Sequence, residues 1–175
     1  MKTKIILLLC LIIFVFSSLG SAEKYSLPEY NISFDIEGEG WQKIPGPKNS
    51  SLTLEKKSSP NFELFTFSTT ANFSEGDKPF QSMTSKEKDE FIAKRRATYV
   101  DNPSPDEQLL SANFVTVGTT LFYIEKTHQT KMNYNSAYVL WTSVDRMYFV
   151  GYISSDLGSF DASLDKILKS IQYLK

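Results

Sequence analysis

The stretch "QLLSANFVTVGTTLFYIEKTHQ", residues 108–129, decides the fold class because it contains two strand-like runs joined at a glycine turn. Two more runs rich in β-branched and aromatic residues follow, "YNSAYVLWTSV" at 134–144 and "RMYFVGYISS" at 146–155. The connections between the four runs are short, as they are in hairpins. The second half of the chain therefore predicts an antiparallel meander of four strands.

Strand signals also lie upstream of the meander. The segment "YNISFDI", residues 30–36, alternates apolar and polar side chains, which is the period of a half-buried strand. A turn region rich in glycine and proline follows at 38–47. The runs "SLTLEKK" at 51–57 and "NFELFTFSTT" at 61–70 then predict a hairpin.

A charged helix is predicted in mid-chain, over "TSKEKDEFIAKRRATYV" at 84–100. Thr84 is its expected N-cap, and Glu87 stands three residues later, which is the spacing of a capping box. The basic run "KRR" at 94–96 is interpreted as a solvated helix face, with an anion site as the alternative.

A second helix is predicted at the end of the chain, over "GSFDASLDKILKSIQ" at 158–172, with Ser159 as its cap. Its apolar residues share one helical face; they are Phe160, Leu164, Ile167, Leu168 and Ile171. The order strands, helix, strands, helix, around a mostly antiparallel sheet flanked by helices, predicts the α+β class.

The first 22 residues have the three zones of a secretory signal: the basic "MKTK", an apolar run at 5–16, and the small-residue tail "SSLGSA". The apolar run is shorter than the roughly 20 residues that a membrane-spanning helix needs. Gly20 and Ala22 are small, so we expect cleavage after Ala22. Cys10 follows three leucines, which disfavours a lipoprotein signal.

The first prediction is that the mature protein begins at Glu23 and carries no acyl chain. Intact-mass measurement of exported material tests it, and an acylated terminal Cys10 would contradict it.

The mature region, residues 23–175, is 153 residues long and is predicted to be a single domain. This region contains no cysteine and so can form no disulfide. A domain of this size buries roughly 70% of its unfolded surface, so a hydrophobic core alone can stabilise it. The signal removes two lysines, which leaves 17 of the 19 basic residues against 20 acidic ones. This balance excludes nucleic acid as an expected partner.

No catalytic constellation is visible in the sequence, and neither a cofactor nor a metal is predicted. His128 is the only histidine, and we expect it to be a solvated turn residue. Asp35, Glu37 and Glu39 form an acidic cluster, but its spacing is not that of a calcium loop, so a solvated turn is the favoured interpretation.

The arrangement resembles the PsbP-like domain superfamily. The resemblance rests on the opening "ISFDIEGEGW" at 32–41, the hairpin, the charged helix, the meander, and the final helix ending in "ILKSIQ". The superfamily includes the extrinsic photosystem subunit PsbP, a Ran-binding nuclear import factor and exported bacterial domains of unknown role. The resemblance implies an α/β/α sandwich and a binding or assembly role. No position here matches a PsbP metal-binding or photosystem-docking residue, and the signal resembles a bacterial one.

A candidate binding surface follows from the last hairpin. If Val144–Asp145 is its turn, Leu140 pairs with Phe149 on one face, which suits the last helix. The opposite face carries three aromatic side chains suited to an exposed groove; they are Trp141, Tyr148 and Tyr152. The alternative is that the first helix covers this face.

The sequence thus predicts an exported, soluble, non-catalytic binding or assembly module, periplasmic or extracellular, with a protein partner in the cell envelope and no stable membrane anchor. Two alternatives stay open. One is a hydrolase whose site is built from dispersed acids and hydroxyls, and the other is an envelope protein held by an uncleaved signal.

Overall fold

The computed structural model describes residues 22–58, 60–71, 78–143 and 146–174. They belong to two compact units, one running to Glu39 and resuming at Ser170, and the other spanning Gly40–Lys169. The predicted signal lies outside the described residues except for Ala22. The single domain at 23–175 stays a prediction.

The first unit is a small sheet of three strands in the order β1-β2-β10. Its strands are β1 (Ala22–Leu27), β2 (Ile32–Glu37) and β10 (Gln172–Tyr173), with the short helix η1 (Pro28–Tyr30) between β1 and β2. Both neighbours pair antiparallel with β2, in which Ile32, Phe34 and Ile36 are buried. The strand predicted from the alternation at 30–36 is therefore confirmed as β2.

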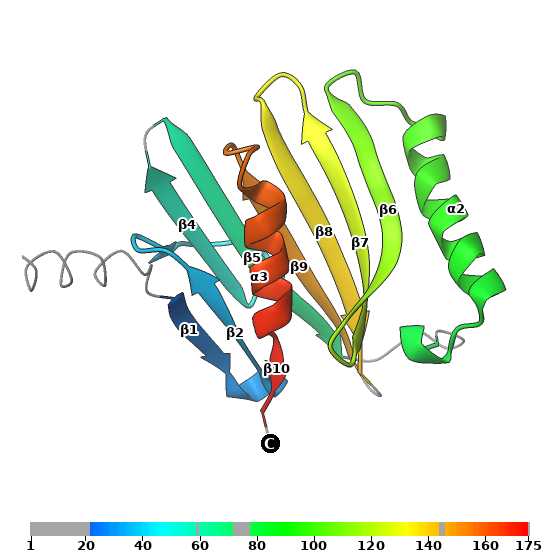
Figure 1. The fold of residues 1–175 in the computed structure, drawn as a ribbon, viewed down its shortest axis with the longest axis horizontal. Helices are drawn as coiled ribbons and strands as arrows, with labels where there is room; N and C mark the ends of the chain where they lie inside the picture. The colour runs from blue at the N-terminus through cyan, green and yellow to red at the C-terminus, as the bar shows by residue number, and fades with distance from the viewer. Residues whose placement is uncertain (1–21, 59, 72–77, 144–145, 175) are drawn as a thin grey trace, which may run out of the picture. The chain divides into compact units, whose positions relative to one another are not determined.

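The second unit is built on a sheet of seven strands in the order β3-β4-β5-β9-β8-β7-β6 (Figure 1). Every pairing between its described strands is antiparallel. Their bounds are β3 Gln42–Lys43, β4 Leu52–Ser58, β5 Asn61–Ala71, β6 Glu107–Val117, β7 Thr120–Gln129, β8 Tyr134–Thr142 and β9 Arg146–Ser154. The predicted hairpin and meander are both confirmed, and β9 joins them by pairing with β5.

The mid-chain helix α2 (Ser85–Asp101) follows the short helix η2 (Phe80–Ser82). Its N-terminus has the predicted capping box. The backbone N–H of Glu87 donates to the Oγ1 of Thr84 at 3.2 Å, and the N–H of Thr84 donates to the Oε2 of Glu87 at 2.8 Å. Two backbone donors that the helix leaves unpaired are thereby satisfied.

The capping box predicts a pH dependence. Hydrogen bonds from Lys78 and Thr84 lower the pKa of Glu87 from 4.5 to about 2. Because the folded pKa lies below the unfolded one, the stabilisation is fully present above pH 4.5 and is lost as the pH falls through about 2. An NMR titration of the Glu87 carboxyl should show a midpoint near 2, and Thr84→Ala should raise it. A folded-state midpoint near 4.5 would contradict the assignment.

The final helix α3 (Phe160–Ser170) has the predicted apolar face. Phe160, Leu164, Ile167 and Leu168 are buried, while Ile171 lies beyond the helix end and is half-buried. The ring of Phe160 stacks on Tyr152 of β9, with centroids 5.5 Å apart. The helix is therefore docked on the sheet by its own apolar stripe. Among the described residues, no helix is both long and apolar enough to span a membrane.

The two helices cover opposite faces of the seven-stranded sheet. Successive residues of a strand point to opposite faces. In β7, Glu125 binds Arg95 of α2, whereas the next residue, Lys126, binds Asp161 of α3. The α+β architecture with a helix on each face is confirmed within this unit.

The predicted pairing of the last hairpin is correct, but the helices were assigned to the wrong faces. Leu140 pairs with Phe149, as expected, and both belong to the core that packs against α2. The last helix instead covers the face of Tyr152. Strand alternation tells which residues share a face, but it does not tell which helix crosses that face. The turn residues Val144 and Asp145 lie outside the described residues.

Candidate functional site

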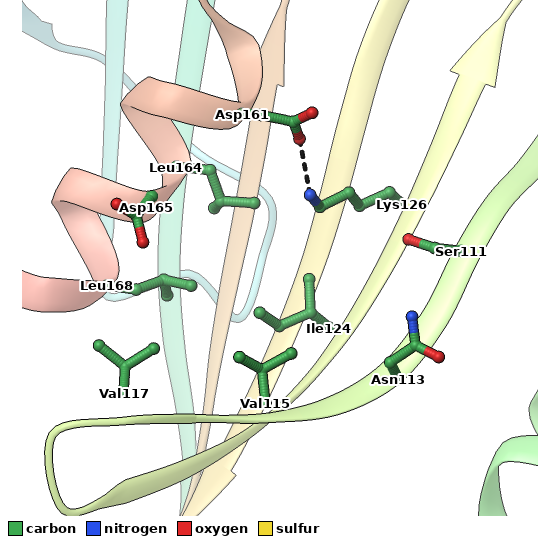
Figure 2. A pocket seen from close by; sticks show the side chains of 10 residues that line it. All are labelled: Ser111, Asn113, Val115, Val117, Ile124, Lys126, Asp161, Leu164, Asp165 and Leu168. Atoms are coloured by element: carbon green, nitrogen blue, oxygen red, sulfur yellow. Dashed lines mark hydrogen bonds and ion pairs between the residues drawn. The ribbon is translucent and has the colours of Figure 1, made fainter.

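A pocket of about 190 Å³ lies between α3 and the strands β6 and β7 (Figure 2). Strand alternation and helical spacing direct the lining side chains into one space. They are Ser111, Asn113, Val115 and Val117 of β6, Ile124 and Lys126 of β7, and Asp161, Leu164, Asp165 and Leu168 of α3.

The pocket has an aliphatic part and a polar part. In Figure 2, Val115 and Ile124 of the sheet and Leu164 of α3 face the same space. Val115 is 40% exposed, so this apolar surface is open to a ligand. None of the ten described residues that line the space is aromatic, which favours aliphatic groups as occupants.

The charged groups of the pocket are engaged with each other or with a neighbour. The Nζ of Lys126 lies 2.6 Å from the Oδ1 of Asp161, and Asp165 pairs with Lys169 at 2.6 Å. By contrast, the side chains of Ser111 and Asn113 make no hydrogen bond to any described residue. A hydroxyl and an amide are therefore available to a ligand beside the aliphatic surface.

The pocket was not predicted from the sequence. The sequence signal for the pocket is the run of side chains without rings on the α3-facing side of β6, namely Ser111, Asn113, Val115 and Val117. The same side of β8 and β9 carries larger rings, such as Trp141. Small side chains under a helix leave space that large ones would fill.

The predicted aromatic groove is wrong as to exposure. Trp141 and Tyr152 are 0% exposed and Tyr148 is 3% exposed. Trp141 stacks on Tyr148 with centroids 5.1 Å apart, and the hydroxyl of Tyr152 donates to Glu63 at 2.6 Å. None of the three lines the pocket. Amphipathic aromatic side chains suit a partly covered surface and a core equally well, so residue type could not decide between them.

A second cluster of titratable groups surrounds Glu125, which is only 3% exposed. Arg95 donates two hydrogen bonds to its carboxylate, at 3.1 and 3.0 Å, and Tyr123 donates one at 2.7 Å. Tyr99 of α2 donates another. The buried charge is thus paired and hydrogen-bonded, which is the condition for burying a carboxylate without a large penalty.

Hydrogen bonds and charge keep the Glu125 carboxylate ionised and the two tyrosine hydroxyls protonated. Burial by itself would raise the pKa of Glu125, but the hydrogen bonds from Tyr99, Arg95 and Tyr123 outweigh it and lower that pKa. Burial, and then the hydrogen bond to Glu125, raises the pKa of both tyrosines. The carboxylate therefore acts as a fixed acceptor that attaches α2 to the sheet.

The interpretation of "KRR" as a solvated helix face is wrong for Arg95, because its side chain binds Glu125 of the sheet. Arg96 also contacts the sheet, since it donates a hydrogen bond to the carbonyl oxygen of Ala112 at 3.2 Å. His128 lies on β7 rather than in a turn, with its Nδ1 2.9 Å from the Oδ1 of Asn135. Within the described ranges, no group of three or more His, Cys, Asp or Glu residues is arranged to hold a metal ion.

Comparison with known proteins identifies the fold. No family model and no curated protein matches the chain. The chain is similar to the solution structure of cyanobacterial PsbP (CyanoP) from Synechocystis, with a TM-score of 0.59 and 13% identity over 89% of this chain and 94% of that one. It is also similar to a crystal structure from Bacteroides thetaiotaomicron, with a TM-score of 0.55 and 15% identity over 87% of this chain. It spans about half (48%) of that second protein.

Both likenesses cover most of the chain at identities too low to carry residue roles from one protein to another. The resemblance found in the sequence is therefore confirmed at the level of architecture. The chain adopts a PsbP-like α+β fold.

Proposed function

We propose that the chain is an exported, non-catalytic module that binds a protein partner of the cell envelope through the pocket between α3, β6 and β7. The observation that carries the proposal is an open aliphatic surface next to the polar side chains of Ser111 and Asn113, which make no hydrogen bond within the described part of the chain. A few apolar anchors with polar groups beside them are the usual composition of a binding site.

The chemistry of the pocket favours binding over hydrolysis. Its ten lining residues include no histidine or cysteine, and Lys126 and Asp161 engage each other. Nucleophilic catalysis needs a nucleophile with a base in reach and a third group to orient it. The cluster with shifted pKa values, centred on Glu125, lies on the opposite face of the sheet, where it attaches α2 to β7.

Export is the part of the proposal that rests on the sequence. The basic, apolar and small-residue zones at 1–22 direct the chain across a membrane, and cleavage after Ala22 releases it. The PsbP-like fold is compatible with this role but does not specify it, because one fold serves several functions.

Site-specific photocrosslinking in living cells tests the proposal. A benzophenone amino acid placed at Val115, which lines the pocket, should give one discrete adduct with an envelope protein. The control carries the same group at Met132, which is 64% exposed and outside the pocket, and should give no such adduct. No adduct at Val115, or the same adducts at both positions, would contradict the proposal.

A further inference from the structure

The open edge of β6 runs alongside the pocket. β6 is the last strand of the seven-stranded order, so one side of its backbone has no neighbouring strand among the residues that the structure describes. Edge backbone of this kind can pair with an incoming strand. The same strand supplies Ser111, Asn113, Val115 and Val117 to the pocket. A ligand in the pocket therefore lies next to a strand edge.

The turn between β6 and β7 determines which backbone groups point to that edge. Gly118 and Thr119 form a two-residue connection, and the φ of Gly118 is +60°, as the first position of a type II′ turn requires. Such a turn is closed by a hydrogen-bonded pair, here Val117 with Thr120. Hydrogen-bonded and non-hydrogen-bonded pairs then alternate along the strand. The N–H and C=O groups of Phe114 and Thr116 consequently point away from β7.

Ala112 confirms this alternation independently. It is the next residue in the series after Phe114, and its carbonyl oxygen accepts a hydrogen bond from Arg96 of α2. A carbonyl that pointed only towards β7 would not be accessible to that guanidinium group. The outward groups of Phe114 and Thr116 are thus the part of this edge left for an additional strand.

Two cations flank the edge on its α2 side. The Nζ of Lys88 lies 6.0 Å from the centre of the Phe114 ring, and Arg96 binds the Ala112 carbonyl. Neither forms an ion pair with a described carboxylate. On the α2 side this part of the edge therefore carries two cations, whereas on the α3 side it carries Val115 and Val117 beside the polar Ser111 and Asn113.

We infer that the partner presents an extended segment that pairs with the β6 edge and alternates aliphatic with acidic side chains. This inference rests on the proposed function and specifies its partner. Alternate residues of a strand point to opposite faces, so aliphatic side chains point towards the pocket and acidic ones towards Lys88 and Arg96. Backbone pairing supplies affinity and the two faces supply specificity, as in other cases of strand addition.

A second copy of this chain fits the edge less well. Between the bulge at Leu109/Ser111 and the turn, the β6 residues on the α2 side are Ala112, Phe114 and Thr116, so this part of an added β6 would bring no carboxylate to meet the two cations. Glu107, the carboxylate of β6 on that side, lies beyond the bulge. The competing explanation is that Lys88 and Arg96 protect the edge from pairing, as basic residues often do. The two explanations predict opposite results with a peptide.

The test measures fluorescence anisotropy of a labelled, terminally blocked peptide, Glu-Val-Glu-Val-Glu-Val-Glu, titrated with the purified protein. We expect saturable binding. Methylating alternate backbone nitrogens removes the donors for strand pairing, and exchanging Glu for Lys reverses the charge, so each change should weaken binding at least tenfold. Lys88→Glu should weaken binding of the acidic peptide and strengthen that of the basic one. Lys94→Glu, on an exposed part of α2, should change neither.

The outcomes separate this inference from the proposed function. Equal binding of the N-methylated peptide, or equal effects of Lys88→Glu and Lys94→Glu, would overturn it. So would no peptide binding by a protein that still crosslinks at Val115, a result that leaves the proposed function standing. Self-association with no peptide binding would assign the edge to a second copy and overturn the inference as well.

Discussion

Replacing Glu125 with alanine is expected to lower the free energy of unfolding by about 3 kcal/mol. The change removes the acceptor of Arg95, Tyr99 and Tyr123, and the buried hydroxyl of Tyr123 loses the carboxylate oxygen that accepts its hydrogen bond. Breaking a buried ion pair on one side typically costs about 3–5 kcal/mol. We place the effect at the lower end because the Arg95 side chain is 37% exposed and can be solvated. Urea unfolding measures it.

Two further variants separate charge from packing at this cluster. Glu125→Gln keeps the size and one acceptor, so it should cost less than the alanine variant. Arg95→Ala should lower the free energy of unfolding less than Glu125→Ala only if water enters and solvates the Glu125 carboxylate. A double-mutant cycle between the two positions should show clear coupling. A loss below about 1 kcal/mol for Glu125→Ala would mean that the cluster does not hold α2 on the sheet.

Leu168→Ala is expected to lower the free energy of unfolding by about 2–5 kcal/mol, the usual range for truncating a buried leucine. Leu168 is 4% exposed and lies on the apolar face that docks α3. The matched control is Lys169→Ala at the next position, where the side chain is 64% exposed and pairs with Asp165 within the same helix. Denaturant midpoints measure both, and equal shifts would mean that the docked face of α3 has been misassigned.

Local features of the fold could be predicted because neighbouring residues determine them. The capping box at Thr84 and Glu87 depends on one turn of helix. The pairing of Trp141 with Tyr148 depends on the position of one turn and a period of two. The strand β1 was missed because "AEKYSL" has no clear alternation, and its pairing with β2 supplies what its own sequence lacks.

The role of Arg95 could have been found in the sequence. It is four residues after Phe91 and four before Tyr99, so the helical period places all three on one face. The surrounding charges obscured this pattern, since a basic run usually marks a solvated face. What the sequence could not supply was Glu125, which comes from a strand 30 residues further along the chain.

The pocket could not be predicted for a different reason. The segments that line it have the sequence patterns of an ordinary strand or helix. The space arises because α3 crosses the part of the sheet where β6 carries small side chains. The path of a helix over a sheet depends on packing between distant segments. For the same reason, the predictions that the last helix covers the Leu140 face and that Trp141 lies in an exposed groove were wrong.

The central claim is that the pocket and the β6 edge together form one site for a partner. The most direct measurement is a competition experiment. The protein with the benzophenone amino acid at Val115 is crosslinked in an extract of the cell envelope while the blocked Glu–Val peptide is added in increasing amounts, and the yield of the adduct is measured. The account predicts that the adduct disappears as the peptide saturates the protein, while the Lys–Val peptide leaves it unchanged. An adduct that persists undiminished at saturating peptide would contradict the account.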